Sequence, residues 1–154
     1  SLDPNIKSHN YLNLVMADLE VRDRSSHAWA VLLDTRGYVS EGIGSNVFFV
    51  KNGEILTPNA GFVLPGVSRA VVLELAAGEG IRVHETDIPP EQARDADEAF
   101  ITSTSFCICP VRSYDGVSLD GDGIPGPVTR RLSDAFSSEA GFDFVGQYVE
   151  ALKG

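Results

Sequence analysis

The stretch YVSEGIGSNVFFVKNGEILTP, residues 38–58, decides the fold expectation. It contains three short runs typical of strands, at residues 38–39, 47–50 and 54–57. Lys51-Asn52-Gly53 separates the last two runs, and an Asn-Gly pair favours a tight turn between antiparallel strands. The sequence therefore predicts a hairpin over 47–57, preceded by a glycine-rich turn, Glu-Gly-Ile-Gly-Ser-Asn, at 41–46.

Working outward from this hairpin, strands and helices are expected to alternate along the chain. Helices are predicted over 8–20, 67–78, 90–96, 129–138 and 144–153, and further strands over 28–34, 81–87, 99–103 and 108–114. Residues 115–127 are rich in Gly and Asp and are predicted to be a loop. The alternation of strands, helices and a hairpin favours an α/β fold with a mixed sheet.

The predicted helix over 8–20 has an apolar face, because Leu12, Val15, Met16 and Leu19 recur at spacings of three and four. It follows Ser1-Leu2-Asp3-Pro4 and Ile6-Lys7 almost at once. The chain thus starts as though it began in the middle of a protein.

Composition excludes several classes of partner. The 154 residues suit one domain with a core, and the net charge of −10 disfavours nucleic acid or an anionic membrane as partner. No apolar run reaches the roughly 20 residues of a membrane span, and no signal-peptide pattern is present.

The two cysteines are Cys107 and Cys109. At this spacing on a strand, both side chains are expected on one face. Two cysteines are too few for an ordinary metal site, so no metal is predicted, and free buried thiols favour the cytoplasm.

Four groups of residues can carry chemistry, although each also has an ordinary explanation. Lys7 precedes a helix and Glu41 lies in a turn, where solvated or capping side chains are common. Gly66-Val67-Ser68 opens a helix, whose free N–H groups can bind an anion or simply be capped. The hydroxyl run 102–105 can hold a phosphate or merely end a strand.

The combination is more informative than any one motif. IKSHNYL (6–12), EGIGSNVF (41–48), LPGVSR (64–69), ADEAFITSTS (96–105), CPV (109–111) and GPVT (126–129) follow one another in this order. Over roughly residues 5–135 this series resembles the large domain of class IV, fold-type IV aminotransferases. This family includes branched-chain and D-amino-acid aminotransferases and aminodeoxychorismate lyase. The resemblance implies a mixed sheet partly closed into a barrel and flanked by helices.

The resemblance also implies a site for pyridoxal 5′-phosphate. Lys7 matches the lysine that holds the cofactor covalently, and Glu41 matches the acid that pairs with the pyridine nitrogen. The remaining matches are Val67 and Ser68 at the helix that binds the phosphate, Ser103 and Thr104 in a second phosphate-binding segment, Asn46 as a supporting asparagine, and Tyr11 near the cofactor. Tyr11 follows Lys7 by four residues, a spacing more like that of the D-amino-acid and lyase branches.

The implied function is transfer of an amino group between a branched-chain or D-amino acid and a 2-keto acid. A pyridoxal-phosphate lyase on the same scaffold and an inactive, truncated cofactor-binding domain are the alternatives. Residues 1–154 would form one domain, the large C-terminal one, without the small N-terminal domain that contributes an arginine to the phosphate site in the family. A homodimer is expected.

Overall fold

The computed structural model describes residues 12–23, 25, 28–119 and 121–151. At its centre is a five-stranded sheet in the order β5-β4-β3-β6-β7. Its strands are β3 (Asn46–Lys51), β4 (Glu54–Pro58), β5 (Val83–Thr86), β6 (Glu98–Ser103) and β7 (Cys107–Val111). Only β4 and β5 pair in parallel, so the sheet is mixed.

The predicted hairpin is confirmed. Val50 pairs with Ile55, and the turn between them holds both Asn52 and Gly53 at positive φ, 51° and 77°. Asparagine and glycine are the residues that adopt this conformation at least cost, which explains why the chain turns here.

Both faces of the sheet are buried, because side chains alternate along each strand. On β3, Phe48 and Val50 join one apolar cluster, whereas Val47 and Phe49 join the other. Phe48 also stacks on Phe100 of β6, with ring centroids 4.7 Å apart. A strand covered on both sides needs a continuous run of apolar residues, and residues 47–50 form such a run.

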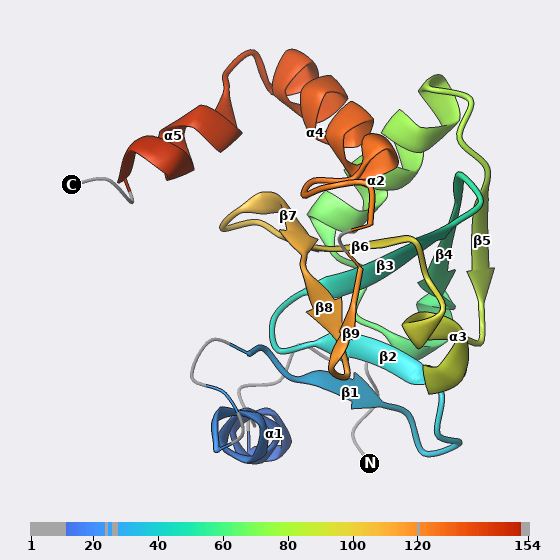
Figure 1. Ribbon diagram of the computed structural model, residues 1–154. Coiled ribbons are helices and arrows are strands. Elements are labelled where there is room, and N and C mark those ends of the chain that lie inside the picture. The colour runs from blue at the N-terminus through green and yellow to red at the C-terminus, as the bar shows by residue number, and fades with distance from the viewer. Residues whose placement is uncertain (1–11, 24, 26–27, 120, 152–154) are drawn as a thin grey trace.

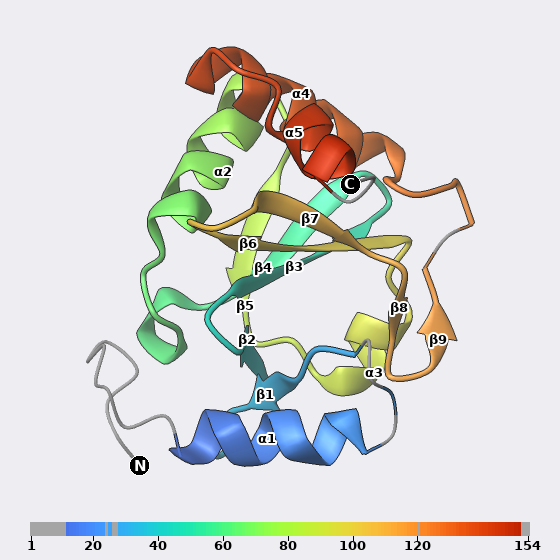
Figure 2. The same cartoon turned by 90° about the vertical axis from the view of Figure 1, so that its left-hand side faces the viewer.

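Different elements cover the two faces (Figure 1). One face is covered by α2 (Val67–Gly78), α4 (Pro127–Ala140) and α5 (Phe144–Ala151). The other face of the sheet is covered by β1 (Val31–Leu33), β2 (Val39–Gly42), α3 (Pro90–Arg94), β8 (Ser113–Tyr114) and β9 (Val117–Ser118). A one-turn helix, η1 (Ala60–Phe62), precedes α2, and α1 (Leu12–Arg22) lies outermost, beside β1 (Figure 2).

A buried carboxylate joins α4 to the sheet. Glu98 on β6 is 5% exposed and accepts bonds from the N–H groups of Val128 and Thr129, at 3.0 and 2.9 Å. The Thr129 hydroxyl donates a third bond at 2.8 Å. A carboxylate at a helix N-terminus satisfies donors that the helix itself leaves unpaired.

The α/β class, the mixed sheet and its flanking helices are confirmed, and two details of the sequence interpretation are wrong. The predicted loop 115–127 contains β9, which pairs with β8. Cys107 and Cys109 do not share a face, because they pack against opposite clusters. The reason is that Cys107 has a φ of 58°, which interrupts the alternation of a regular strand. The described strands form an open sheet and two separate pairs, so barrel closure stays a prediction.

The apolar face predicted for the first helix exists but is not covered by the described residues. No residue of α1 is buried, and the four residues of this face are half exposed or more: Leu12, Val15, Met16 and Leu19. Large exposed apolar patches are common where a protein surface associates with another structure.

Candidate active site

Glu41 lies on β2 and reaches the segment before α2. Its Oε2 accepts the N–H of Leu64 at 2.9 Å, and the neighbouring Ser40 hydroxyl donates to the Phe62 carbonyl at 2.7 Å. Burial raises the pKa of the Glu41 carboxyl above its ordinary value, while the Leu64 N–H favours the carboxylate and opposes that rise. Glu41 is therefore a half-buried acid fixed by a backbone donor.

Asn46, at the start of β3, connects this segment to α2. Its Nδ2 donates to the Leu64 carbonyl at 3.0 Å, so both polar backbone groups of Leu64 are held. Gly66 lies so close that a Cβ placed on it would be 2.2 Å from Asn46 Oδ1. Only a glycine leaves room for this approach, which explains the residue before the helix.

The N-terminus of α2 has no side-chain cap. Its N-cap, Gly66, has no side chain to bond the first N–H groups, which belong to Val67 and Ser68. Ser68 is buried and Val67 is 70% exposed. Arg69, buried in the same turn, donates to the Pro58 carbonyl at 3.1 Å and to Glu85 at 2.6 Å, which anchors the helix to β4 and β5.

The end of β6 adds hydroxyl groups next to Asn46, because Asn46 pairs with Thr102 in the sheet. The side-chain oxygens of Thr102 and Ser45 are buried and have no partner among the described residues. Ser103 is half-buried and accepts the Ser105 N–H at 3.1 Å, while Thr104 is exposed in the turn. Unpaired buried hydroxyls are unusual and are consistent with a polar ligand.

The structure thus connects three predicted segments through Asn46: Glu41 by way of Leu64, the start of α2 at Gly66, and β6 at Thr102, the residue before Ser103 and Thr104. Lys7 and Tyr11 lie outside the described residues. Sequence reasoning missed Ser40, Leu64 and Ser45. No local pattern distinguishes them, because each contributes through a partner distant in sequence or through its backbone.

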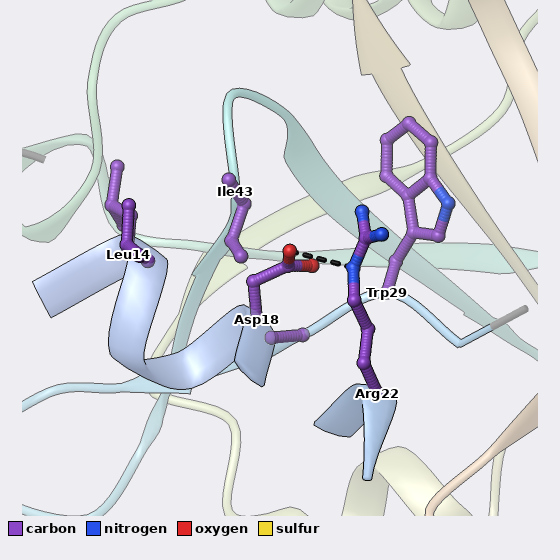
Figure 3. A pocket seen from close by; sticks show the side chains of 7 residues that line it. Leu14, Asp18, Arg22, Trp29 and Ile43 are labelled. Carbon is purple, nitrogen blue, oxygen red and sulfur yellow. Dashed lines mark ion pairs between the residues drawn. The ribbon is translucent and has the colours of Figure 1, made fainter. Parts of the chain in front are cut away.

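A hollow of about 430 Å³ lies between α1 and the strands next to Glu41 (Figure 3). Its walls are mainly apolar, and an Asp18–Arg22 ion pair of 2.7 Å lies beside it. Ile43, in the turn after Glu41, and Trp29 also line it. Trp29 contacts Phe106 edge to face, with centroids 5.6 Å apart, so this hollow adjoins the turn that carries Thr104.

The part of the chain that the structure describes contains no group of three or more His, Cys, Asp or Glu side chains suited to a metal ion. None of its helices combines the length and apolarity needed to span a membrane.

Comparison with known proteins identifies the family of this chain. The Amino-transferase class IV family matches residues 1–114. The branched-chain-amino-acid aminotransferase of Salmonella typhimurium is 41% identical over 128 residues, which are 82% of this chain and 41% of that protein. Branched-chain-amino-acid aminotransferase-like protein 1 of Arabidopsis thaliana is 40% identical over 136 residues, 88% of this chain and 24% of that protein.

A solved structure gives the same result at the level of the fold. The branched-chain amino acid aminotransferase of Thermobaculum terrenum, in its PLP form, superimposes with a TM-score of 0.85 at 36% identity. The match covers 93% of this chain and 47% of that one, so the chain spans less than half of each of these relatives. With a family match over residues 1–114 and this agreement in fold, the chain belongs to the class IV aminotransferase family.

Proposed function

We propose that this chain is the cofactor-binding large domain of a pyridoxal-phosphate-dependent aminotransferase. The observation that carries the proposal is the meeting of three segments around Asn46: an acid on a strand, an uncapped helix start and a hydroxyl-rich strand exit. These are the groups that a phosphorylated pyridine needs, namely neutral donors for the phosphate and a carboxylate for the ring nitrogen.

The donor set fits the phosphate. The N–H groups of Val67 and Ser68 at the uncapped end of α2 would bind a dianion in the favourable end of the helix dipole. Ser103 and Thr104 would complete the cup from β6. No net positive charge is required, which is compatible with a chain of charge −10.

Glu41 would keep the pyridine nitrogen protonated, held in place by the Leu64 N–H. Bound pyridoxal phosphate supplies an electron sink for a carbanion at the substrate α-carbon. Lys7 would hold the cofactor covalently, and its Nζ would be the group that moves the proton at that carbon. Tyr11 would line the same side of the cofactor.

The substrates proposed are a branched-chain amino acid and a 2-keto acid, because two similar proteins are named as a branched-chain-amino-acid aminotransferase and a protein like it. The spacing of Lys7 and Tyr11 favours instead the D-amino-acid and lyase branches. A smaller domain and a second copy of the protein would complete the site and cover the apolar face of α1. Both cysteines are free, which fits a reducing compartment such as the cytoplasm.

The test uses the whole protein with pyridoxal phosphate. Borohydride reduction followed by peptide mapping should label Lys7, and a label elsewhere would overturn the assignment of the lysine. The Glu41→Ala variant should lose turnover far more than cofactor affinity, because the role of the carboxylate is electronic. Near-normal kcat in that variant would remove Glu41 from the site.

Two alternatives give different results in the same assays. A lyase on this scaffold would bind the cofactor at Lys7 but release product without any keto acid. A domain without activity would bind the cofactor weakly or not at all and would turn over neither type of substrate.

A further inference from the structure

Arg36, in the turn between β1 and β2, binds two carboxylates with one planar group. Its Nη1 and Nη2 donate to the two oxygens of Asp87, each at 2.8 Å. Its Nε and Nη2 donate to Asp34 Oδ2, at 3.0 and 2.7 Å. Asp87 lies 51 residues away along the chain, just after β5. Arg36 therefore joins two distant surface segments with a geometry that lysine cannot reproduce.

The same guanidinium lies on the segment between β4 and α2. Its carbon is 3.9 Å from the centroid of the Phe62 ring, and Asn59 Nδ2 donates to Asp87 Oδ1 at 3.0 Å. Asn59 is the N-cap of η1 and Phe62 is its last residue, so both ends of this one-turn helix are held by the Arg36–Asp87 pair. A cation over an aromatic face adds attraction to the packing contact.

The far end of this segment reaches the proposed site within two residues. Phe62 accepts the Ser40 hydroxyl, and Leu64 donates its N–H to Glu41 and accepts from Asn46. The position of residues 59–64 therefore sets the direction in which the Glu41 carboxylate is held. It also sets the place where α2 begins.

We infer that Arg36 is a positioning residue: through Asp87, Asn59 and Phe62 it fixes segment 59–65 and thereby aligns Glu41 with the start of α2. Arg36 has no contact with Glu41 itself, so it acts through the segment. The alternative is a half-exposed ion pair that contributes only to general stability, as most such pairs do. The inference rests on the proposed function where it concerns the cofactor, but the alignment itself is a property of the chain.

Amide hydrogen exchange tests the alignment without any cofactor. In Arg36→Met, the Leu64 amide should exchange roughly 3- to 10-fold faster than in the wild type, because its acceptor is in place for a smaller fraction of the time. Amides of β3 and β6 should change only as far as the global stability does. The matched control is Arg131→Met, since Arg131 makes two comparable surface bonds to Glu79, at 2.9 and 3.0 Å, far from Glu41.

Cofactor binding tests the consequence in the whole protein. Arg36→Met should weaken the affinity for pyridoxal phosphate by roughly 3- to 10-fold, and Arg131→Met should leave it within about twofold. Asp87→Asn should act in the same direction as Arg36→Met, and the double variant should be no weaker than Arg36→Met alone. Asp87→Asn alone serves if Arg36→Met proves too unstable, because it keeps the Arg36–Phe62 contact.

The outcomes separate the two ideas. Equal Leu64 exchange in Arg36→Met and Arg131→Met, or additive effects of Arg36→Met and Asp87→Asn on that exchange, would overturn the positioning role. Wild-type protein that fails to bind pyridoxal phosphate would refute the proposed function, and the exchange measurement would then decide the alignment alone. Faster Leu64 exchange together with unchanged affinity would overturn the link from Arg36 to the cofactor.

Discussion

Gly66→Ala is the substitution whose effect the geometry defines most closely. Gly66 has φ −70° and ψ 140°, a conformation open to alanine, so the backbone itself is not strained. The added Cβ would instead lie 2.2 Å from Asn46 Oδ1, where ordinary contact starts at 3.4 Å. The Asn46 oxygen therefore has to move by about 1.2 Å, the difference of these two distances, and Asn46 is 6% exposed and bonded to Leu64.

The cost follows from three terms. Overpacking a buried site costs about 1–3 kcal/mol, and losing the Asn46–Leu64 bond costs about 1 kcal/mol. Restricting the unfolded chain returns about 0.4–1 kcal/mol. We expect a net loss of about 1–3.6 kcal/mol in the free energy of unfolding. For a chain of this size that lowers Tm by roughly 2–14 °C.

The matched control lies at the other end of the same helix. A Cβ on Gly78 meets nothing within 4 Å, and its φ is not positive. Gly78→Ala should therefore stabilise the chain by about 0.5–1 kcal/mol through helix propensity alone. Thermal unfolding followed by circular dichroism should thus show shifts of opposite sign for the two glycines.

A second background isolates the contact. When Asn46→Ala has already removed the oxygen, Gly66→Ala should cost less than about 1 kcal/mol, since what remains is the preference for glycine over alanine at an N-cap, offset by the restriction of the unfolded chain. If Gly66→Ala leaves Tm unchanged or raises it in the wild type, the packing of Asn46 against α2 is wrong. In that case Asn46 does not hold Leu64 and the start of α2 together.

Three further predictions concern single carboxylates. Glu98→Ala should destabilise the chain by about 2–4 kcal/mol in urea unfolding, because three buried donors of Val128 and Thr129 lose their acceptor; a loss below about 1 kcal/mol would contradict the cap. Glu41→Gln should raise Tm of the cofactor-free chain at neutral pH, because burial raises the pKa of Glu41 and its ionised form destabilises the fold. This gain in Tm should vanish as the pH falls below the ordinary pKa of a glutamate, and a gain that persists in acid would refute the prediction. Asp97→Asn should lower Tm at neutral pH, because the Asn52 N–H lowers the pKa of Asp97 and favours its carboxylate. The greater stability of the wild type should disappear as the pH falls through that lowered pKa. A difference in Tm that does not depend on pH would be the contrary result.

Local signals predicted most of the secondary structure. The helix predicted over 67–78 is the one observed, Val67–Gly78, and the hairpin forms at its Asn-Gly turn. These features depend on neighbouring residues, whose propensities and turn conformations act within a few positions. The predictions were wrong where the conformation does not follow from neighbouring residues in the sequence. The examples are the positive φ of Cys107 and the short strand Val117–Ser118.

The motifs named the segments of the site, but not the contacts between them. That Glu41, the start of α2 and the end of β6 belong together came from the order of motifs and from family likeness. The bonds that join them were not visible in the sequence. Leu64 contributes only its backbone groups. Because every residue except proline has a backbone N–H, the residue type does not reveal which one will act as a donor.

By itself, then, the sequence determined the α/β class, the positions of the main helices and strands, and membership in a family of cofactor enzymes. Only the tertiary structure decided that Asn46 joins three segments and that Arg36 reaches Asp87, 51 residues along the chain. Only the structure, too, left the apolar face of α1 exposed among the described residues. The physical reason is that local conformation depends on neighbours in sequence, whereas these contacts depend on how buried strands and helices pack, and packing brings together residues that no spacing relates.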